Sequence, residues 1–183
     1  GPGQQQGQGQ GPVPLLNGKP HPMAQWMING QLTIHSFPPS PDSVPARLGD
    51  NLFLGDFHCS VNRDTLLRLG IKAVVNATTE IACHWPDVFK YHRVAVDDIP
   101  SADIKRYFPK AIQFIDAAVQ RGECVLVHCL AGRARSASIC IAYMMKRGRM
   151  SLKMAFEHIR RIKPDIRPNQ GFWTQLINFE KEL

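Results

Sequence analysis

The sequence predicts an α/β fold, a single domain with a central, mostly parallel sheet flanked by helices. Short aliphatic runs of strand length alternate with amphipathic stretches of helical period from about residue 46 onward. Helical patterns dominate the C-terminal half. The length of 183 residues and the apolar content of 44% suit one hydrophobic core.

The first 45 residues differ in composition from the rest. Residues 1–22 are mostly Gly, Gln and Pro, and such a segment cannot bury enough apolar surface to offset its ordering entropy. We expect a disordered arm or a cloning remnant there. Residues 23–45 regain apolar side chains and then carry four prolines, which indicates an irregular arm packed on the domain. An extra strand or a tethered partner-binding motif is the alternative. The globular domain is predicted to span residues 46–183.

The strands are predicted from short aliphatic runs. A Gly-Asp-Asn turn within residues 48–54 indicates two short strands or a hairpin. Residues 71–77 and 91–96 read as further strands, and the alternation in the second suggests one wetter face. Residues 125–127 form a run typical of a strand buried on both faces.

The helices are predicted from capping residues followed by apolar side chains at helical spacing. Pro109 must lie in a first turn, so we expect a short helix, a break and a longer helix around it. A largely buried helix is expected after Ser136, ending at Gly148. The residues expected to start or stop the other helices are Ser60 with Gly70, Ser101 or Asp103, Ser151 with Pro164, and Asn169.

Composition also restricts the setting and the partners. A formal net charge of +7 and a pI near 9.4 favour a polyanionic partner. Five cysteines without paired spacing argue against a disulfide framework and for a reducing compartment. No apolar run is long enough to span a bilayer, so we expect a soluble protein of the cytoplasm, the nucleus or both. Adjacent His-Cys pairs lack Cys-x-x-Cys spacing, and no metal site is expected.

The segment Cys124 to Ser136, CVLVHCLAGRARS, carries the chemistry. Cys129 lies between a strand end and a helix start, where the helix N-terminus and Arg135 favour the nucleophilic thiolate. The fork of Arg135 can hold two oxygens of a phosphoryl group through a trigonal transition state. Ser136 can donate its hydroxyl to the sulfur. The mostly small residues whose N–H groups can form an anion-binding nest are Leu130, Ala131, Gly132, Arg133 and Ala134.

His128-Cys129 to Arg135-Ser136, with Gly132 between them, resembles the signature of the cysteine-dependent protein phosphatases. Residues 46–183 resemble the small, atypical dual-specificity phosphatases. The segments LFLGD, VVNAT, YFPKAIQFIDAA and RPNQGFWTQLINFE agree with that family. The resemblance implies hydrolysis of phosphotyrosine and phosphoserine or phosphothreonine in proteins through a thiophosphate intermediate. It requires neither a metal nor another cofactor.

The resemblance also implies a general acid, which gives its proton to the leaving oxygen and later activates water. Aligning the chain between Tyr91 and Pro109 places this acid at Asp98, one residue after Asp97. The alternative is that either carboxylate only caps the next helix. His128 is expected to orient the loop and favour the thiolate, or else to be a satisfied core histidine.

Three further side chains are open to two interpretations. Asn76 and Asn169 could brace the loop, or they are ordinary turn and cap residues. Cys124 could be a redox partner of Cys129, but the two lie on opposite strand faces about 16 Å apart, so a structural thiol is expected.

Arg133 and Ala134 stand where many dual-specificity enzymes carry a small aliphatic residue and then serine. An extra cation there would favour a substrate with more than one negative charge, as in lipid and inositide phosphatases of the superfamily. A phospholipid or phosphoinositide phosphatase is therefore the alternative function, although RPNQGFW favours protein substrates. A second alternative is an inactive module that binds phosphorylated proteins. Nucleic acid is not expected as a partner, and the oligomeric state is open.

Overall fold

The computed structural model describes residues 15–16, 18–20, 27–28, 31–32 and 43–183. The expected disorder of residues 1–22 and the packing of residues 23–45 fall largely outside this range. In the described part of the arm, β1 (Leu15–Leu16) pairs with β2 (Lys19–Pro20), and β3 (Met27–Ile28) pairs with β4 (Gln31–Leu32). These described strands therefore form two separate hairpins and add no strand to the main sheet.

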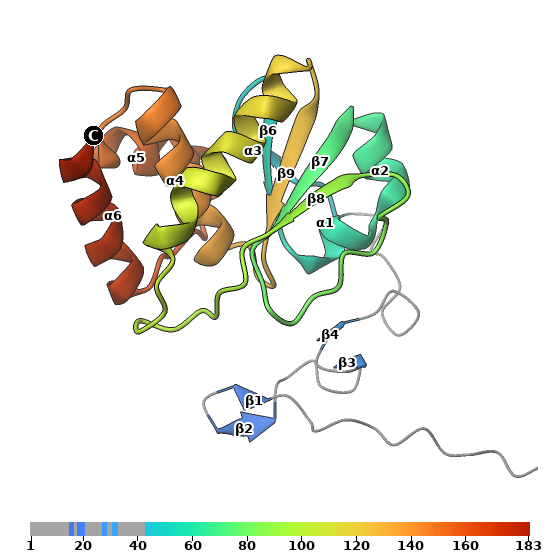
Figure 1. Cartoon of the computed structure of the whole chain (residues 1–183), viewed down its shortest axis with the longest axis horizontal. Helices are drawn as coiled ribbons and strands as arrows, with labels where there is room; N and C mark the ends of the chain where they lie inside the picture. Colours follow the sequence, from blue (N-terminus) through green and yellow to red (C-terminus); the bar gives the residue numbers. More distant parts are fainter. Residues whose placement is uncertain (1–14, 17, 21–26, 29–30, 33–42) are drawn as a thin grey trace, which may run out of the picture.

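The main sheet has five strands in the order β5-β6-β9-β7-β8 (Figure 1). Its strands are β5 (Ala46–Arg47), β6 (Leu52–Gly55), β7 (Ile71–Asn76), β8 (Lys90–Arg93) and β9 (Cys124–His128). Only β5 runs antiparallel to its neighbour. Gly55 of β6 and Asn76 of β7 both pair with His128, so three strands end together at the same edge. The expected mostly parallel sheet and the hairpin at its start are confirmed.

Helices cover both faces of the sheet. The helices are α1 (Phe57–Val61), α2 (Arg63–Arg68), α3 (Phe108–Gln120), α4 (Arg135–Arg147), α5 (Leu152–Ile162) and α6 (Gln170–Glu182), with a 3-10 turn η3 (Lys105–Tyr107). Along β9, Val125 and Val127 join the core under α3 to α6, while Leu126 joins the smaller core with Leu66 of α2. This alternation is the period of a strand buried on both faces.

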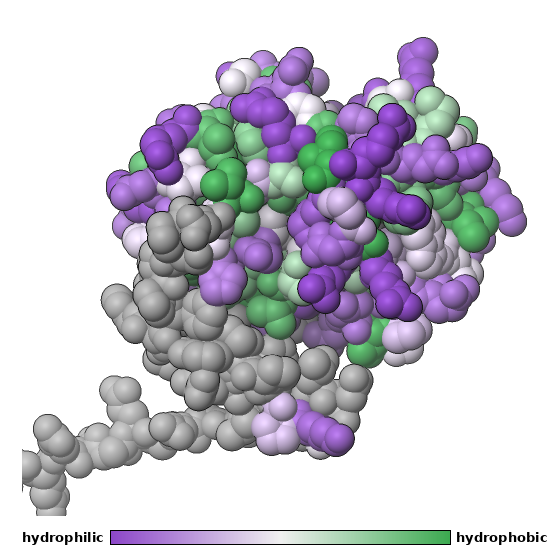
Figure 2. Space-filling view, turned by 180° about the vertical axis from the view of Figure 1, so that it is seen from behind, coloured by the Kyte–Doolittle hydropathy of each residue, from purple (hydrophilic) through white to green (hydrophobic). Residues whose placement is uncertain are grey.

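Hydrophilic side chains cover most of the face in Figure 2, between smaller apolar areas. Among the described residues, no helix combines the length and the apolar character needed to cross a membrane.

The predicted caps of α5 and α6 are confirmed. Ser151 Oγ accepts the N–H of Met154 at 3.1 Å, and Asn169 Oδ1 accepts the N–H of Phe172 at 2.9 Å. Pro109 lies in the first turn of α3, directly after η3, as the sequence predicted.

The prediction that Ser60 caps a helix reaching to residue 69 is wrong. Asp56 caps α1 by accepting the N–H of Cys59 at 3.0 Å, and Asn62 caps α2. The backbone of Asn62 leaves the helical region with ψ of 75°, which divides the segment into two short helices. Ser60 lies inside α1 and donates its hydroxyl to Phe57 O at 2.6 Å.

The strand predicted for residues 91–96 ends earlier, at Arg93. The N–H of Val94 still donates to Asn76 O, but the N–H of Val96 bonds to Val94 O, and the chain turns away from β7. The carbonyl of Val96 then accepts a hydrogen bond from Arg135 instead of a strand partner. The shortening therefore brings the next loop to the edge where β9 ends.

Candidate active site

Cys129 is the first residue after β9 and is only 3% exposed. Its Sγ lies 3.0 Å from Ser136 Oγ and accepts the N–H of Gly132 at 3.2 Å. Ser136 belongs to the first turn of α4, whose N-terminus therefore lies beside the sulfur. Hydrogen-bond donors and the positive end of a helix stabilise a negatively charged sulfur. The Ser136 hydroxyl is within hydrogen-bond distance of the sulfur, as its predicted role as a donor requires.

The loop from Cys129 to Arg135 depends on its glycine. Gly132 has φ of +69°, a conformation that side chains with Cβ rarely adopt. A Cβ at this position would also lie 2.9 Å from Gly55 O at the end of β6. The N–H of Phe57 donates to Leu130 O at 3.0 Å. The loop is thus packed against the connection between β6 and α1.

Arg135 is buried, with 5% exposure, and its position is fixed by an acidic partner. Its Nη1 and Nη2 donate to the Glu80 carboxylate at 2.9 and 2.6 Å, and Nη1 also donates to Val96 O at 3.1 Å. Burial alone would lower the pKa of Arg135, but hydrogen bonds to Glu80 and the charges of Cys129, Glu80 and Asp98 raise it. The guanidinium therefore stays charged.

The remaining guanidinium nitrogen is available. Nε of Arg135 is buried, and no acceptor from the described residues lies within hydrogen-bond distance of it. A buried donor without an acceptor is costly, so its position next to the loop predicted to bind phosphate favours an oxyanion ligand.

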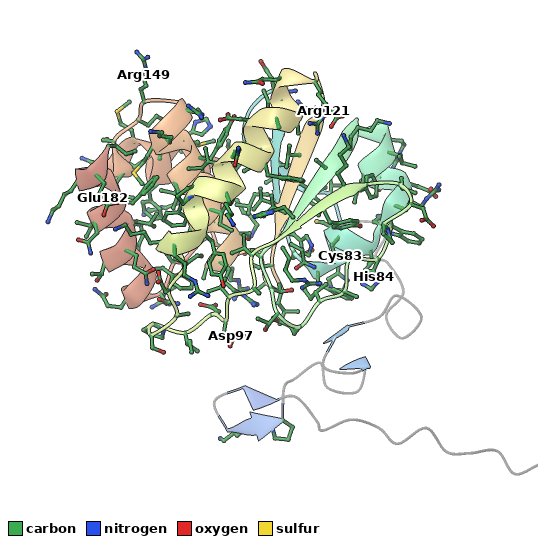
Figure 3. All side chains as sticks on the ribbon, viewed as in Figure 1. Cys83, His84, Asp97, Arg121, Arg149 and Glu182 are labelled. Carbon is green, nitrogen blue, oxygen red and sulfur yellow. The ribbon has the colours of Figure 1, made fainter. Side chains whose placement is uncertain are left out.

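The two neighbouring aspartates are held by different parts of the domain. Asp98 Oδ1 accepts from Asn169 Nδ2 at 2.9 Å, whereas Asp97 Oδ1 accepts from Thr79 Oγ1 at 2.8 Å. Asp97 lies at the edge of the domain where the strands end (Figure 3). The N–H of Arg106 in the following η3 is bonded to the carboxylate of Asp103. Asp97 and Asp98 thus each accept a hydrogen bond from a side chain distant in sequence, whereas the carboxylate that bonds the start of the next helical turn belongs to Asp103.

His128 is buried between the ends of three strands. Its Nδ1 lies 3.2 Å from Cys129 O, and its own carbonyl accepts the N–H of Ala77 at 2.9 Å. Burial is the main cause that lowers the pKa of His128 to about 4. The imidazole is therefore neutral at physiological pH and can donate to the carbonyl of the cysteine.

The low pKa of His128 predicts a loss of stability in mild acid. The pKa is about 4 in the folded state against an ordinary 6.5, so the unfolded state binds more protons between these values. Stability is retained above pH 6.5 and falls as the pH decreases through this window, by about 2 kcal/mol from pH 7.5 to pH 5. Urea unfolding at both pH values measures the effect. His128→Gln should lose less stability over the same interval, and an equal loss in the variant would contradict the prediction.

The two asparagines have different surroundings. Asn76 Nδ2 donates to Ile81 O at 2.8 Å, and its Oδ1 accepts from Thr78 Oγ1 at 2.7 Å. It braces the connection between β7 and β8, and within the described part of the chain its side chain has no hydrogen bond to the cysteine loop. Asn169 caps α6 and holds Asp98 at the same time.

The residues at the loop rim are tied to the connection between α5 and α6. Arg133 Nε lies 3.3 Å from Asp165 Oδ2, and Arg133 O accepts the N–H of Arg167 at 2.6 Å. Ala134 is buried, and its carbonyl accepts from the N–H and the hydroxyl of Ser138. Where many dual-specificity enzymes carry a serine, this chain therefore has a small apolar side chain inside the core.

Cys124 and Cys129 contribute to different cores on opposite faces of the sheet. This agrees with the expectation that Cys124 is a structural thiol.

Glu80 and Thr79 were not among the predicted site residues. Both follow β7, the strand beside β9 in a parallel sheet, and the carboxyl ends of such strands meet at one edge. That position in the chain was the available signal.

Comparison with known proteins identifies the family. Residues 52–182 match the family model described as "Dual specificity phosphatase, catalytic domain". Human dual specificity protein phosphatase 14 is 42% identical over 139 residues, which cover 75% of this chain and 70% of that protein. Human dual specificity protein phosphatase 9 is 38% identical over 143 residues, which cover 77% of this chain but only 37% of the relative.

The solved structure of human DUSP28 has a TM-score of 0.74 at 33% identity, covering 79% of this chain and 97% of that chain. The domain therefore has the fold of the cysteine-dependent phosphatases, a class of phosphoric monoester hydrolases. The chain belongs to the dual specificity phosphatase family, and the predicted resemblance to its small, atypical members is confirmed.

Proposed function

We propose that this protein hydrolyses phosphotyrosine and phosphoserine or phosphothreonine in proteins through a phosphocysteine intermediate. One observation carries the proposal: the Cys129 sulfur lies against the N–H of Gly132 and the hydroxyl of Ser136, in a loop ending at Arg135. A site for phosphoryl transfer needs a nucleophile, hydrogen-bond donors that stabilise it and a guanidinium with a free donor, and this loop provides all three.

The first step transfers the phosphoryl group to sulfur. The Cys129 thiolate attacks phosphorus in line, so the S–P bond forms while the P–O bond to the substrate breaks. Asp98 gives its proton to the departing oxygen, which is most important for the alkoxide of serine or threonine. Arg135 and the backbone N–H groups of residues 130–134 neutralise the charge on the equatorial oxygens.

The second step releases phosphate. Asp98, now ionised, takes a proton from a water molecule that attacks phosphorus, and the S–P bond breaks. The donors of Ser136 and Gly132 stabilise the thiolate as it leaves. No step requires a metal ion.

Replacing Asp98 by Asn tests this function. Turnover of a phosphothreonine peptide should fall by roughly 10²- to 10³-fold, while an aryl phosphate with an acidic leaving group changes little. The comparison of kcat on the two substrates measures the contribution of the general acid.

Asp97→Asn is the matched control, because Thr79 can still donate to the amide oxygen at position 97. This variant should affect both substrates slightly and equally. Equal losses on both substrates in Asp98→Asn, or a larger leaving-group dependence in Asp97→Asn, would contradict the role of Asp98.

The rim of the loop favours protein substrates over anionic lipid headgroups. The cation expected to favour a second negative charge, Arg133, pairs with Asp165, which also accepts from Lys163 at 2.8 Å. Two cations thus share one carboxylate, which weakens their attraction for a second phosphate. Lipid or inositide phosphates remain the alternative substrates.

The setting proposed for this activity is the cytoplasm, the nucleus or both. All five cysteines are free, and a nucleophilic thiol needs a reducing environment to stay active.

A further inference from the structure

The loop that carries Asp98 lies against one face of α6. We call residues 94–104 the acid loop. Besides the bond between Asp98 and Asn169, the C-terminal half of the acid loop touches α6 at two further places, through Gly171 and Gln175. These two residues are four apart and therefore share one face of the helix.

Gly171 lies against the backbone of the acid loop. A Cβ built at this position would lie 1.8 Å from Pro100 O and 2.5 Å from its carbonyl carbon. Carbon and oxygen atoms cannot approach that closely, and a backbone carbonyl cannot swing aside as a flexible side chain can. Even an alanine at position 171 would therefore require the acid loop and α6 to separate.

Gln175 fixes the end of the same loop with both groups of its amide. Its Nε2 donates to Ala102 O at 2.8 Å, and its Oε1 accepts the N–H of Lys105 at 2.9 Å. Lys105 also forms an ion pair with Glu182 at the last turn of α6. The helix thus contacts the acid loop and η3 along most of its length.

A displacement at Pro100 would reach the carboxylate of Asp98, because the chain between them is stiff. The N–H of Ile99 bonds to Asp97 O at 3.0 Å, and the N–H of Ala102 bonds to Ile99 O at 3.1 Å. The ring of Pro100 fixes its own φ angle. A shift is therefore passed along this turn to the carboxylate two residues earlier.

We propose that Gly171 and Gln175 are positioning residues that set the distance between the Asp98 carboxylate and the leaving oxygen. They act through the backbone of the acid loop and have no contact with substrate. This inference rests on the proposed role of Asp98 as general acid. It makes the first half of α6 part of the framework that aligns the proton donor.

The test is Gly171→Ala, assayed on a phosphothreonine peptide and on an aryl phosphate with an acidic leaving group. Misplacing a catalytic group by about 1 Å can cost roughly 10²-fold, so kcat on the peptide should fall by about 10- to 100-fold. The aryl phosphate, which needs little proton transfer, should change less than about twofold. Gln175→Leu should show the same pattern with a smaller loss, and it carries the test if Gly171→Ala does not fold.

Two variants serve as controls for general damage. Gly49→Ala makes the same chemical change where a Cβ would meet no atom of residues 43–183 within 4 Å. Thr174→Ala removes an exposed hydroxyl of α6 whose hydrogen bond, among the described residues, stays within its own helix, to Gln170 O. Both should keep wild-type rates on the two substrates, with thermal unfolding confirming that each variant is folded.

A double variant separates positioning from a purely structural role. In the Asp98→Asn background, Gly171→Ala should cause little further loss on the phosphothreonine peptide, because the proton donor is already absent. Equal losses on both substrates, no loss on the peptide, or additive losses in the double variant would overturn the inference. If Asp98→Asn itself shows no leaving-group dependence, the proposed function fails. If Asp98→Asn shows that dependence and both α6 variants lack it, only the inference fails.

Discussion

Cys129→Ser should reduce turnover of phosphopeptides and aryl phosphates alike by roughly 10⁴-fold or more. The serine hydroxyl would have to lose its proton in order to attack. The groups bonded to the sulfur, the N–H of Gly132 and the hydroxyl of Ser136, stabilise an anion but provide no base. Steady-state kinetics on both substrates measure the loss, which should be independent of the leaving group.

The same variant should still bind a phosphotyrosine peptide, because Arg135 and the backbone of the loop are unchanged. Cys124→Ser is the control, since that half-buried thiol belongs to the opposite core and should tolerate the change. Full turnover by Cys129→Ser would exclude Cys129 as the nucleophile. A wild-type protein that binds the peptide without hydrolysing it would instead support the inactive binding module.

The sequence was most informative where the chemistry is local. Cys129, Gly132, Arg135 and Ser136 lie within eight positions, and a strand end followed by a helix start brings such residues together whatever surrounds them. The geometry of the loop could therefore be predicted from one segment. The same holds for the caps Ser151 and Asn169, whose partners are three residues away.

Contacts that depend on tertiary structure could not be predicted in this way. Glu80 is 55 positions from Arg135, and apart from its place after β7 nothing in its own segment distinguishes it from an exposed carboxylate. The incorrect prediction of a helix cap at Ser60 has a local cause. Asp56 and Asn62, which lie close to Ser60 in the sequence, can also cap helices, and in the structure they do. Only one of the two contacts of Asn169 could be predicted from its own segment. Its helix cap is local, but its bond to Asp98 joins residues 71 positions apart.

Arg135→Lys should lower turnover by roughly 10³-fold, although the positive charge is conserved. Arg135 bonds Glu80 through both terminal nitrogens, which leaves Nε for an oxygen of the substrate. A lysine has a single nitrogen and cannot bind the carboxylate in this way while also holding a phosphoryl oxygen. Inhibition by inorganic phosphate should weaken in parallel with kcat.

The dependence on leaving group distinguishes this arginine from Asp98. Because Arg135 acts on the equatorial oxygens, Arg135→Lys should slow acidic and poor leaving groups by similar factors, whereas Asp98→Asn spares the acidic ones. Arg133→Lys is the matched control from the same loop, since Arg133 is exposed and pairs with Asp165 at the rim. If Arg135→Lys retained more than about a third of wild-type kcat, a positive charge alone would suffice at this position. That result would contradict the role of the guanidinium geometry inferred from the bonds between Arg135 and Glu80.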